Sequence, residues 1–161
     1  MLIDYRFSNF RSFKEITSLS MVAGRQTTLN ENLIRAHELR IVPSAVIYGA
    51  NASAKSNIIM SMEVMRDIVI SGSLEANLPN LKNLELYPFA YQKSQKPMKF
   101  EIDFISFGTR IQFGFEVEVD TFKKGSRKIV SEFLTHIDKS EQKTAIYSRS
   151  RDKINIYKTK K

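Results

Sequence analysis

One stretch of the sequence constrains the fold more than any other. It spans residues 44–57, Ser-Ala-Val-Ile-Tyr-Gly-Ala-Asn-Ala-Ser-Ala-Lys-Ser-Asn, and passes from an apolar run through small residues to Lys-Ser. This is the layout of a phosphate-binding loop, whose pattern is G-x-x-x-x-G-K-[ST]. Gly49, Lys55 and Ser56 match the pattern, whereas Ala54 stands where the second glycine is expected. The stretch therefore predicts a buried strand starting near Ser44, followed by a phosphate loop and a helix.

The residues after the loop have the period of an α-helix. Apolar side chains recur at spacings of 4, 3 and 4 residues, at Ile58, Met62, Met65 and Val69. Such spacing places the side chains on one buried helix face. We predict a helix from about Lys55 to Ile70 that stops at Ser71-Gly72.

A phosphate loop binds anions through consecutive backbone N–H groups at a helix N-terminus, where the helix dipole is positive. The lysine reaches the β- and γ-phosphates, and the Ser or Thr hydroxyl is a ligand of Mg²⁺. Here Lys55 and Ser56 would take these roles, and Asn51 to Lys55 would supply the amides. The Ala54 methyl group could cost on the order of 1–3 kcal/mol in backbone strain. The residues leave two alternatives open, a working nucleotide site and a degenerate loop that only keeps the fold.

Alternating apolar and polar residues predict strands elsewhere in the chain. Residues 2–7 and 16–22 indicate two strands that pair with each other, and residues 99–120 indicate a hairpin that turns at Gly108-Thr109. The buried face of this hairpin is expected to be strongly aromatic. Further strands are expected over residues 128–137, 144–147 and 154–156. We expect Asp103, Glu116 and Glu118 to face solvent, because they alternate with the apolar residues of the hairpin.

Composition excludes several classes of protein. The chain of 161 residues has no cysteine, which excludes disulfides and thiolate metal sites, and His37 and His136 lack metal-ligand spacing. It has no apolar run long enough for a membrane span and no apolar segment typical of a signal peptide, so a cytoplasmic protein is expected. The net charge of +8 lies in residues 121–161, which hold 12 Lys and Arg against 4 Asp and Glu. This basic block indicates either nucleic-acid binding or a lysine-decorated sheet surface.

Two motifs together resemble the N-terminal part of an ABC-type ATPase. They are Asn9-Phe10-Arg11-Ser12-Phe13 and the run from Tyr48 to Asn57. The resemblance is to bacterial AAA-family ATPases of the AAA_15 and AAA_21 types, called abortive-infection or antiphage ATP-binding proteins and related to the OLD-family nucleases. Those proteins begin with a strand, N-F-R-S-F, a second strand and Y-G-A-N-A-S-G-K-S-N. Residues 23–25, 113–117 and 129–134 also fit, so the resemblance covers nearly the whole chain.

The resemblance implies an α/β P-loop NTPase fold. Residues 1–161 would form a partial ABC-type ATPase head, its N-terminal lobe, with the P-loop strand and helix at 44–71 beside a mostly antiparallel β-subdomain at 99–161. It also implies ATP and Mg²⁺ as cofactors, with Ser56 as the metal ligand and Arg11 near the nucleotide. The implied cofactor-binding residues in the loop are Gly49, Ala50, Asn51, Ala52, Ser53, Ala54, Lys55, Ser56 and Asn57.

The chain departs from the family pattern in a second way. It has no run of four apolar residues followed by Asp-Glu, so it lacks the Walker B base and second metal ligand, and we predict no catalytic residue. We therefore expect a fragment, or a truncated or split member, that does not hydrolyse ATP alone. It would self-associate or bind a partner subunit that supplies the signature and Walker B segments, and it would act with an effector protein or DNA in antiphage defence. The alternative is a non-catalytic interaction module that binds a protein or nucleic acid through the basic C-terminal region.

Overall fold

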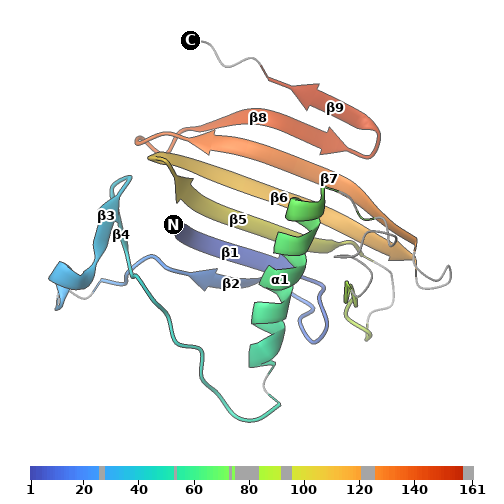
Figure 1. Cartoon of the computed structure of the whole chain (residues 1–161), viewed down its shortest axis with the longest axis horizontal. Coiled ribbons are helices and arrows are strands. Elements are labelled where there is room, and N and C mark those ends of the chain that lie inside the picture. The colour runs from blue at the N-terminus through green and yellow to red at the C-terminus, as the bar shows by residue number, and fades with distance from the viewer. Residues whose placement is uncertain are drawn as a thin grey trace.

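The computed structural model describes residues 1–25, 28–52, 54–72, 74, 84–91, 96–120 and 126–157. Figure 1 shows a long helix crossing one face of a broad antiparallel sheet, with a small two-stranded hairpin to one side. The elements are β1 (Leu2–Ser8), β2 (Thr17–Ser20), a 3-10 helix (Asn30–Asn32), β3 (Ile34–Ala36), β4 (Leu39–Ile41), α1 (Lys55–Ser71), β5 (Met98–Ser106), β6 (Thr109–Asp120), β7 (Ser126–Ile137), β8 (Lys143–Ser150) and β9 (Lys153–Ile156).

The main sheet has seven strands in the order β2-β1-β5-β6-β7-β8-β9, and every neighbouring pair is antiparallel. The predicted hairpin, β5 and β6, forms its centre. The first two strands join the same sheet, because Tyr5 pairs with Ile102 and Phe7 pairs with Phe100. The antiparallel sheet is therefore not confined to residues 99–161.

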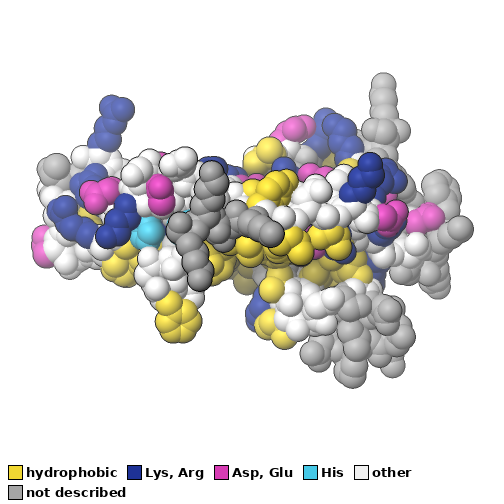
Figure 2. All heavy atoms as spheres, turned by 90° about the horizontal axis from the view of Figure 1, so that it is seen from above, with side chains coloured by type: hydrophobic (Ala, Val, Ile, Leu, Met, Phe, Trp, Pro, Cys, Tyr) yellow, Lys and Arg dark blue, Asp and Glu magenta, His cyan; other side chains and the backbone are white. Residues whose placement is uncertain are grey.

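The core lies between α1 and one face of this sheet. As predicted, the sheet side is strongly aromatic, and the buried cluster includes Tyr5, Phe7, Phe10, Phe100 and Phe115. Val64, Met65 and Ile68 of α1 pack against these rings. Figure 2 shows hydrophobic side chains gathered toward one side of the sheet and most charged side chains toward the other. Burial of apolar surface on one face is thus what fixes α1 on the sheet.

The strand predicted before the phosphate loop is not formed, and this expectation is wrong. Residues 44–49 carry no strand pairing, and Val46 and Tyr48 are 84% and 90% exposed. A strand needs a neighbour for its N–H and C=O groups. Among the described residues, no strand of the seven-stranded sheet or of the β3–β4 hairpin pairs with this segment. The residues have strand-forming side chains but no partner strand.

The opposite face of the sheet carries buried charge, which corrects the expectation for Asp103. Asp103 is 5% exposed, and its carboxylate accepts two hydrogen bonds from Arg110, at 3.1 Å from Nε and 2.8 Å from Nη2. Arg110 also donates to Glu141 at 2.5 Å. Glu118 is exposed as predicted, whereas Glu116 is half-buried. The sheet is covered on its second face by an ion-pair network rather than by solvent alone.

Two further findings bear on the predictions. Within the described ranges, no helix is both long and apolar enough to cross a membrane. The sequence also predicts a loop over residues 73–84 and a turn at 123–126, and both lie mostly outside the described residues.

Candidate phosphate-binding site

The N-terminus of α1 is open to an anion. The helix begins at Lys55, and its N-cap residue, Ala54, makes no side-chain hydrogen bond to the first turn. The first turn also contains no acidic residue. The first N–H groups of a helix lack partners within the helix, and the dipole places positive charge there. A phosphate group would satisfy both the donors and the charge.

The backbone that leads into α1 contains two left-handed residues. Ala52 has φ 62° and Ala54 has φ 64°. A left-handed residue followed by a right-handed one, as at Ala54 and the helical Lys55, turns successive N–H groups toward one side and forms an anion-binding concavity. This conformation costs an L-residue roughly 1–2 kcal/mol, so position 54 favours the glycine that the pattern expects. Ser53, also predicted to bind the cofactor, lies outside the described residues.

Lys55 folds back over the loop. Its Nζ donates to the carbonyl oxygens of Gly49 at 2.8 Å and of Ala50 at 2.7 Å. An ammonium group has three donors and no acceptor. The side chain is therefore held at the loop by carbonyl groups that a bound phosphate could replace. The structure brings Gly49, Ala50 and Lys55 together through these two hydrogen bonds.

The two residues after Lys55 face different surroundings. Ser56 is exposed in the first turn of α1, so its hydroxyl is accessible beside the loop. The amide nitrogen of Asn57 instead donates to the hydroxyl oxygen of Ser12 at 2.9 Å. Asn57 thus ties the turn after β1 to the start of α1. The Asn57 side-chain amide therefore holds the motif of residues 9–13 against the motif of residues 48–57.

Arg11 lies along the flank of α1. Its guanidinium forms an ion pair with Glu85 and stacks on the ring of Tyr87, with 5.3 Å from Cζ to the ring centroid. Its backbone N–H donates to the Tyr87 carbonyl oxygen at 2.8 Å. A cavity that Arg11 helps to line is bounded by α1 residues from Met60 to Asp67, one to three turns beyond the phosphate loop. The structure therefore places the Arg11 side chain apart from Lys55. No residue pattern indicated the exposed Tyr87 ring beside it.

The donor set fits a phosphate with a bound Mg²⁺. Mg²⁺ keeps most of its water and is usually held by one or two protein oxygens together with substrate phosphates. Ser56 offers such an oxygen. In the parts of the chain that the structure describes, no group of three or more His, Cys, Asp or Glu side chains could hold a metal by itself. Binding of Mg²⁺ would therefore depend on phosphate oxygens as its further ligands.

Helix α1 begins with a lysine directly after a loop that contains left-handed residues. The described chain is otherwise a mostly antiparallel sheet with few helices. This arrangement fits an α/β NTPase-like protein with a nucleotide-binding site. The family comparison makes this specific. Residues 44–158 match the family model described as "AAA domain, putative AbiEii toxin, Type IV TA system". The match covers well over half of the chain, and the chain belongs to this family of AAA-type ATPases associated with abortive infection. A search of curated proteins found no match.

Proposed function

We propose that this chain binds the polyphosphate of ATP, with Mg²⁺, at residues 49–57. It would be the Walker A portion of an ABC- or OLD-like ATPase. The observation that carries the proposal is the backbone at the start of α1, where left-handed residues precede an uncapped helix N-terminus and Lys55 lies against the loop carbonyls. Family membership supports the same ligand class.

Each residue then has a defined task. The amides of the loop and of the first turn of α1 would hold the phosphate oxygens. The Lys55 ammonium would exchange its carbonyl partners for phosphate oxygens, where a full negative charge makes a stronger hydrogen bond. The Ser56 hydroxyl would be the protein ligand of Mg²⁺. When bound, ATP would supply a phosphoanhydride bond, and these residues would bind and orient it.

We further propose that the chain does not hydrolyse ATP by itself. A general base must lie within reach of the attacking water. The buried carboxylate of Asp103 is already paired with Arg110 on the far side of the sheet, and Glu118 lies on β6. The chain would self-associate or bind a partner subunit, and it is the partner subunit that would supply the signature and Walker B segments. The assembled protein would couple nucleotide binding to an effector protein, or to DNA, in antiphage defence.

A thermal-shift titration tests the nucleotide site. A ligand that binds only the folded state raises the melting temperature as its concentration exceeds Kd. We expect Mg-ATP to raise Tm and Lys55→Ala to abolish most of the rise. Lys139→Ala, a matched change at an exposed lysine on the β7–β8 loop, should respond like the original chain. An unchanged Tm at millimolar Mg-ATP would rule out the proposed function.

A second candidate is the non-catalytic interaction module with a degenerate loop. The exposure of Val46 and Tyr48 next to the loop favours it, because exposed apolar side chains in a cluster often mark contact surfaces. Binding could also use the basic region, although Lys128 and Arg149 are paired there with Asp152 and Glu132. This candidate predicts no Tm rise with Mg-ATP for the chain as it stands, and a rise that appears only after Ala54→Gly would show that the alanine disables the loop. Nucleic-acid binding through the basic region would weaken steeply as salt is added.

A further inference from the structure

Strand β9 leaves one side of its backbone without a neighbouring strand. It lies at one edge of the seven-stranded sheet, and Figure 1 shows it at the opposite end of the sheet from β2. Among the described residues, the only strand that pairs with β9 is β8. All four residues of β9, Lys153–Ile156, are exposed. An edge strand with free N–H and C=O groups is a template for a further strand.

The register of the β8–β9 pair shows which backbone groups are free. The N–H of Tyr157 donates to the carbonyl oxygen of Ile146 at 2.9 Å, so Tyr157 faces β8. In an antiparallel pair, successive residues alternately face the neighbouring strand and face away from it. The pairing has no register shift that would interrupt this alternation. The N–H and C=O groups of Ile154 and Ile156 therefore point away from β8, out of the sheet edge.

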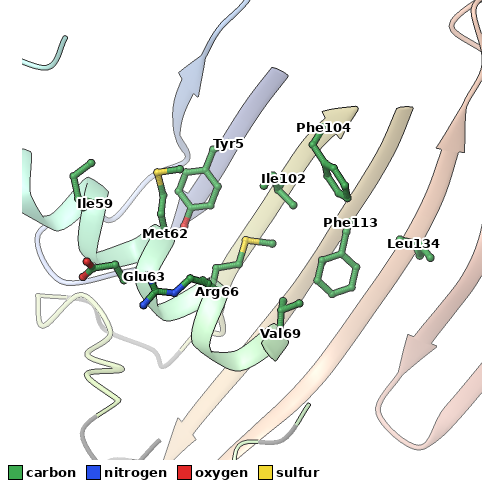
Figure 3. A pocket seen from close by; sticks show the side chains of 11 residues that line it. Tyr5, Ile59, Met62, Glu63, Arg66, Val69, Ile102, Phe104, Phe113 and Leu134 are labelled. Atoms are coloured by element: carbon green, nitrogen blue, oxygen red, sulfur yellow. The ribbon is translucent and has the colours of Figure 1, made fainter. Parts of the chain in front are cut away.

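The side chains of Ile154 and Ile156 are also uncovered, with exposed fractions of 63% and 80%. Ile156 pairs with Tyr147, Tyr147 pairs with Leu134, and Leu134 pairs with Phe113. Paired residues of neighbouring strands lie on the same face of a sheet. Figure 3 shows Leu134 and Phe113 at a cavity of about 830 Å³ between α1 and the sheet. The two isoleucines thus extend the apolar face of the sheet beyond the part that α1 covers.

The other edge strand of the sheet, β2, offers less to a partner. Its residues are Thr-Ser-Leu-Ser, and the one apolar side chain, Leu19, packs against the buried core cluster. Strand β9 therefore differs from β2, because it presents exposed apolar side chains together with free backbone groups.

The charges around β9 favour an acidic partner. Arg151 and Lys153 are exposed, and neither forms an ion pair with another described residue. Asp152, the one acidic residue between 149 and 157, pairs with Lys128 at 3.5 Å. Lys153 alternates with the isoleucines, so it lies on the face of the sheet opposite α1. Two such basic edges would repel each other, whereas acidic side chains on an added strand would attract.

We propose that β9 is a docking edge for an extended polypeptide segment in which apolar and acidic residues alternate. The segment adds to the sheet beside β9, and its backbone pairs with the outward groups of Ile154 and Ile156. Its apolar side chains lie on the α1 face against the two isoleucines, and its acidic side chains lie on the other face near Lys153. The phosphate loop takes no part in this contact, so the docking edge does not depend on nucleotide binding. A contact of this size should be weak and reversible.

Fluorescence anisotropy with a labelled peptide tests the docking edge. The probe is a capped peptide of alternating valine and glutamate, and the full chain should bind it saturably. Ile156→Pro removes an outward N–H but keeps the hydrogen bonds to β8, because edge strands tolerate proline where the N–H faces solvent. It should raise the peptide Kd about tenfold or more. Ile156→Val is the matched control, which keeps the N–H and an apolar side chain and should bind like the original chain.

Charge reversal gives a second test that leaves the backbone of β9 unchanged. Lys153→Glu should raise the Kd for the valine–glutamate peptide about threefold or more. Lys139→Glu, a reversal at an exposed lysine on the β7–β8 loop, should leave this Kd unchanged. A peptide of alternating valine and lysine should bind the original chain more weakly than the acidic peptide, and Lys153→Glu should narrow that difference. Far-UV circular dichroism should be the same for all variants, because the changed side chains are exposed.

Three results would overturn the proposal. The first is that the valine–glutamate peptide does not bind at a submillimolar concentration of the chain. The second is that Ile156→Pro binds the peptide as tightly as Ile156→Val, or that Lys153→Glu has no more effect than Lys139→Glu. The third is that a single-stranded DNA oligonucleotide binds more tightly than the peptide, since the basic side chains rather than the strand edge would then select the partner.

Discussion

Ala54 holds a backbone conformation, φ 64° and ψ 14°, that suits glycine better than alanine. Replacing it by glycine removes strain of roughly 1–2 kcal/mol but adds about 0.5–1 kcal/mol of conformational entropy loss on folding. We expect Ala54→Gly to change stability little and to lower the Kd for Mg-ATP about tenfold or more, because the backbone can then approach the phosphates. Isothermal titration measures the effect. Ala50→Gly is the control, since Ala50 lies outside the left-handed region; an equal gain there would contradict the explanation.

Gly114, in the middle of β6, has no space for a side chain. A Cβ at this position would lie 2.6 Å from Cε1 of Phe133 and 3.1 Å from the carbonyl oxygen of Phe100. The ring can turn aside, but the backbone oxygen of the paired strand cannot. We expect Gly114→Ala to lower the free energy of unfolding by about 1–3 kcal/mol in urea denaturation. Gly24→Ala, which meets nothing within 4 Å, should be neutral or slightly stabilising.

A side-chain hydrogen bond joins strands β7 and β8, and it makes the free energy of unfolding depend on pH. The Tyr147 hydroxyl donates to Glu132 at 2.7 Å, and burial, together with this carboxylate, raises the pKa of Tyr147 well above its ordinary value of 10.0. The unfolded chain loses the Tyr147 proton near pH 10, whereas the folded chain keeps it. Stability from this group is therefore complete below pH 10 and is lost as pH rises above it. The free energy of unfolding should fall above pH 10, and Tyr147→Phe should reduce the slope.

The control for that measurement is Tyr91→Phe, because Tyr91 is 90% exposed. Its slope above pH 10 should equal that of the original chain. A slope equally steep in Tyr147→Phe would show that the β7–β8 hydrogen bond makes no contribution.

Elements with a strong local pattern were predictable. The helix was expected over 55–70 and spans Lys55–Ser71, and Gly72 ends it with φ 63°, as a glycine stop predicts. The hairpin at Gly108 was equally clear. By contrast, the β3–β4 hairpin turns at His37 and Glu38, both left-handed, and neither residue is a typical signal for such a turn. The sequence there offered nothing from which the hairpin could be inferred.

Contacts between distant parts of the chain could not be predicted in the same way. Pairing of β1 with β5 joins residues about a hundred positions apart, and no local pattern specifies a strand's neighbours. For the same reason Asp103 was expected in solvent, since alternation gives the face of a strand but not what covers that face. The candidate phosphate loop was proposed from local residue types, whereas the position of the Arg11 side chain depends on Glu85 and Tyr87.

The whole molecule divides into a hydrogen-bonded sheet with α1 and an exposed segment that carries the phosphate loop. The core strands β5 and β6 are paired along their full facing lengths. Within the described chain, residues 44–49 belong to no strand or turn and make no backbone–backbone hydrogen bond with another described residue. Amide exchange measures this difference, because an unbonded exposed amide exchanges without any unfolding.

We expect the amides of residues 44–50 to exchange with protection factors below about 10, and those of Phe100 and Phe115 to be protected by about 10³ or more. Strong protection of residues 44–50 in the free chain would mean that the segment does pair with something. Mg-ATP should slow exchange at residues 50–57, where the phosphates accept hydrogen bonds, and leave Val46 unchanged. Protection that spreads to Val46 and Tyr48 only when a second polypeptide is added would identify the missing neighbour of this strand-forming segment. Nucleotide binding and strand pairing are thus separable, because the first protects the loop and the second protects the residues before it.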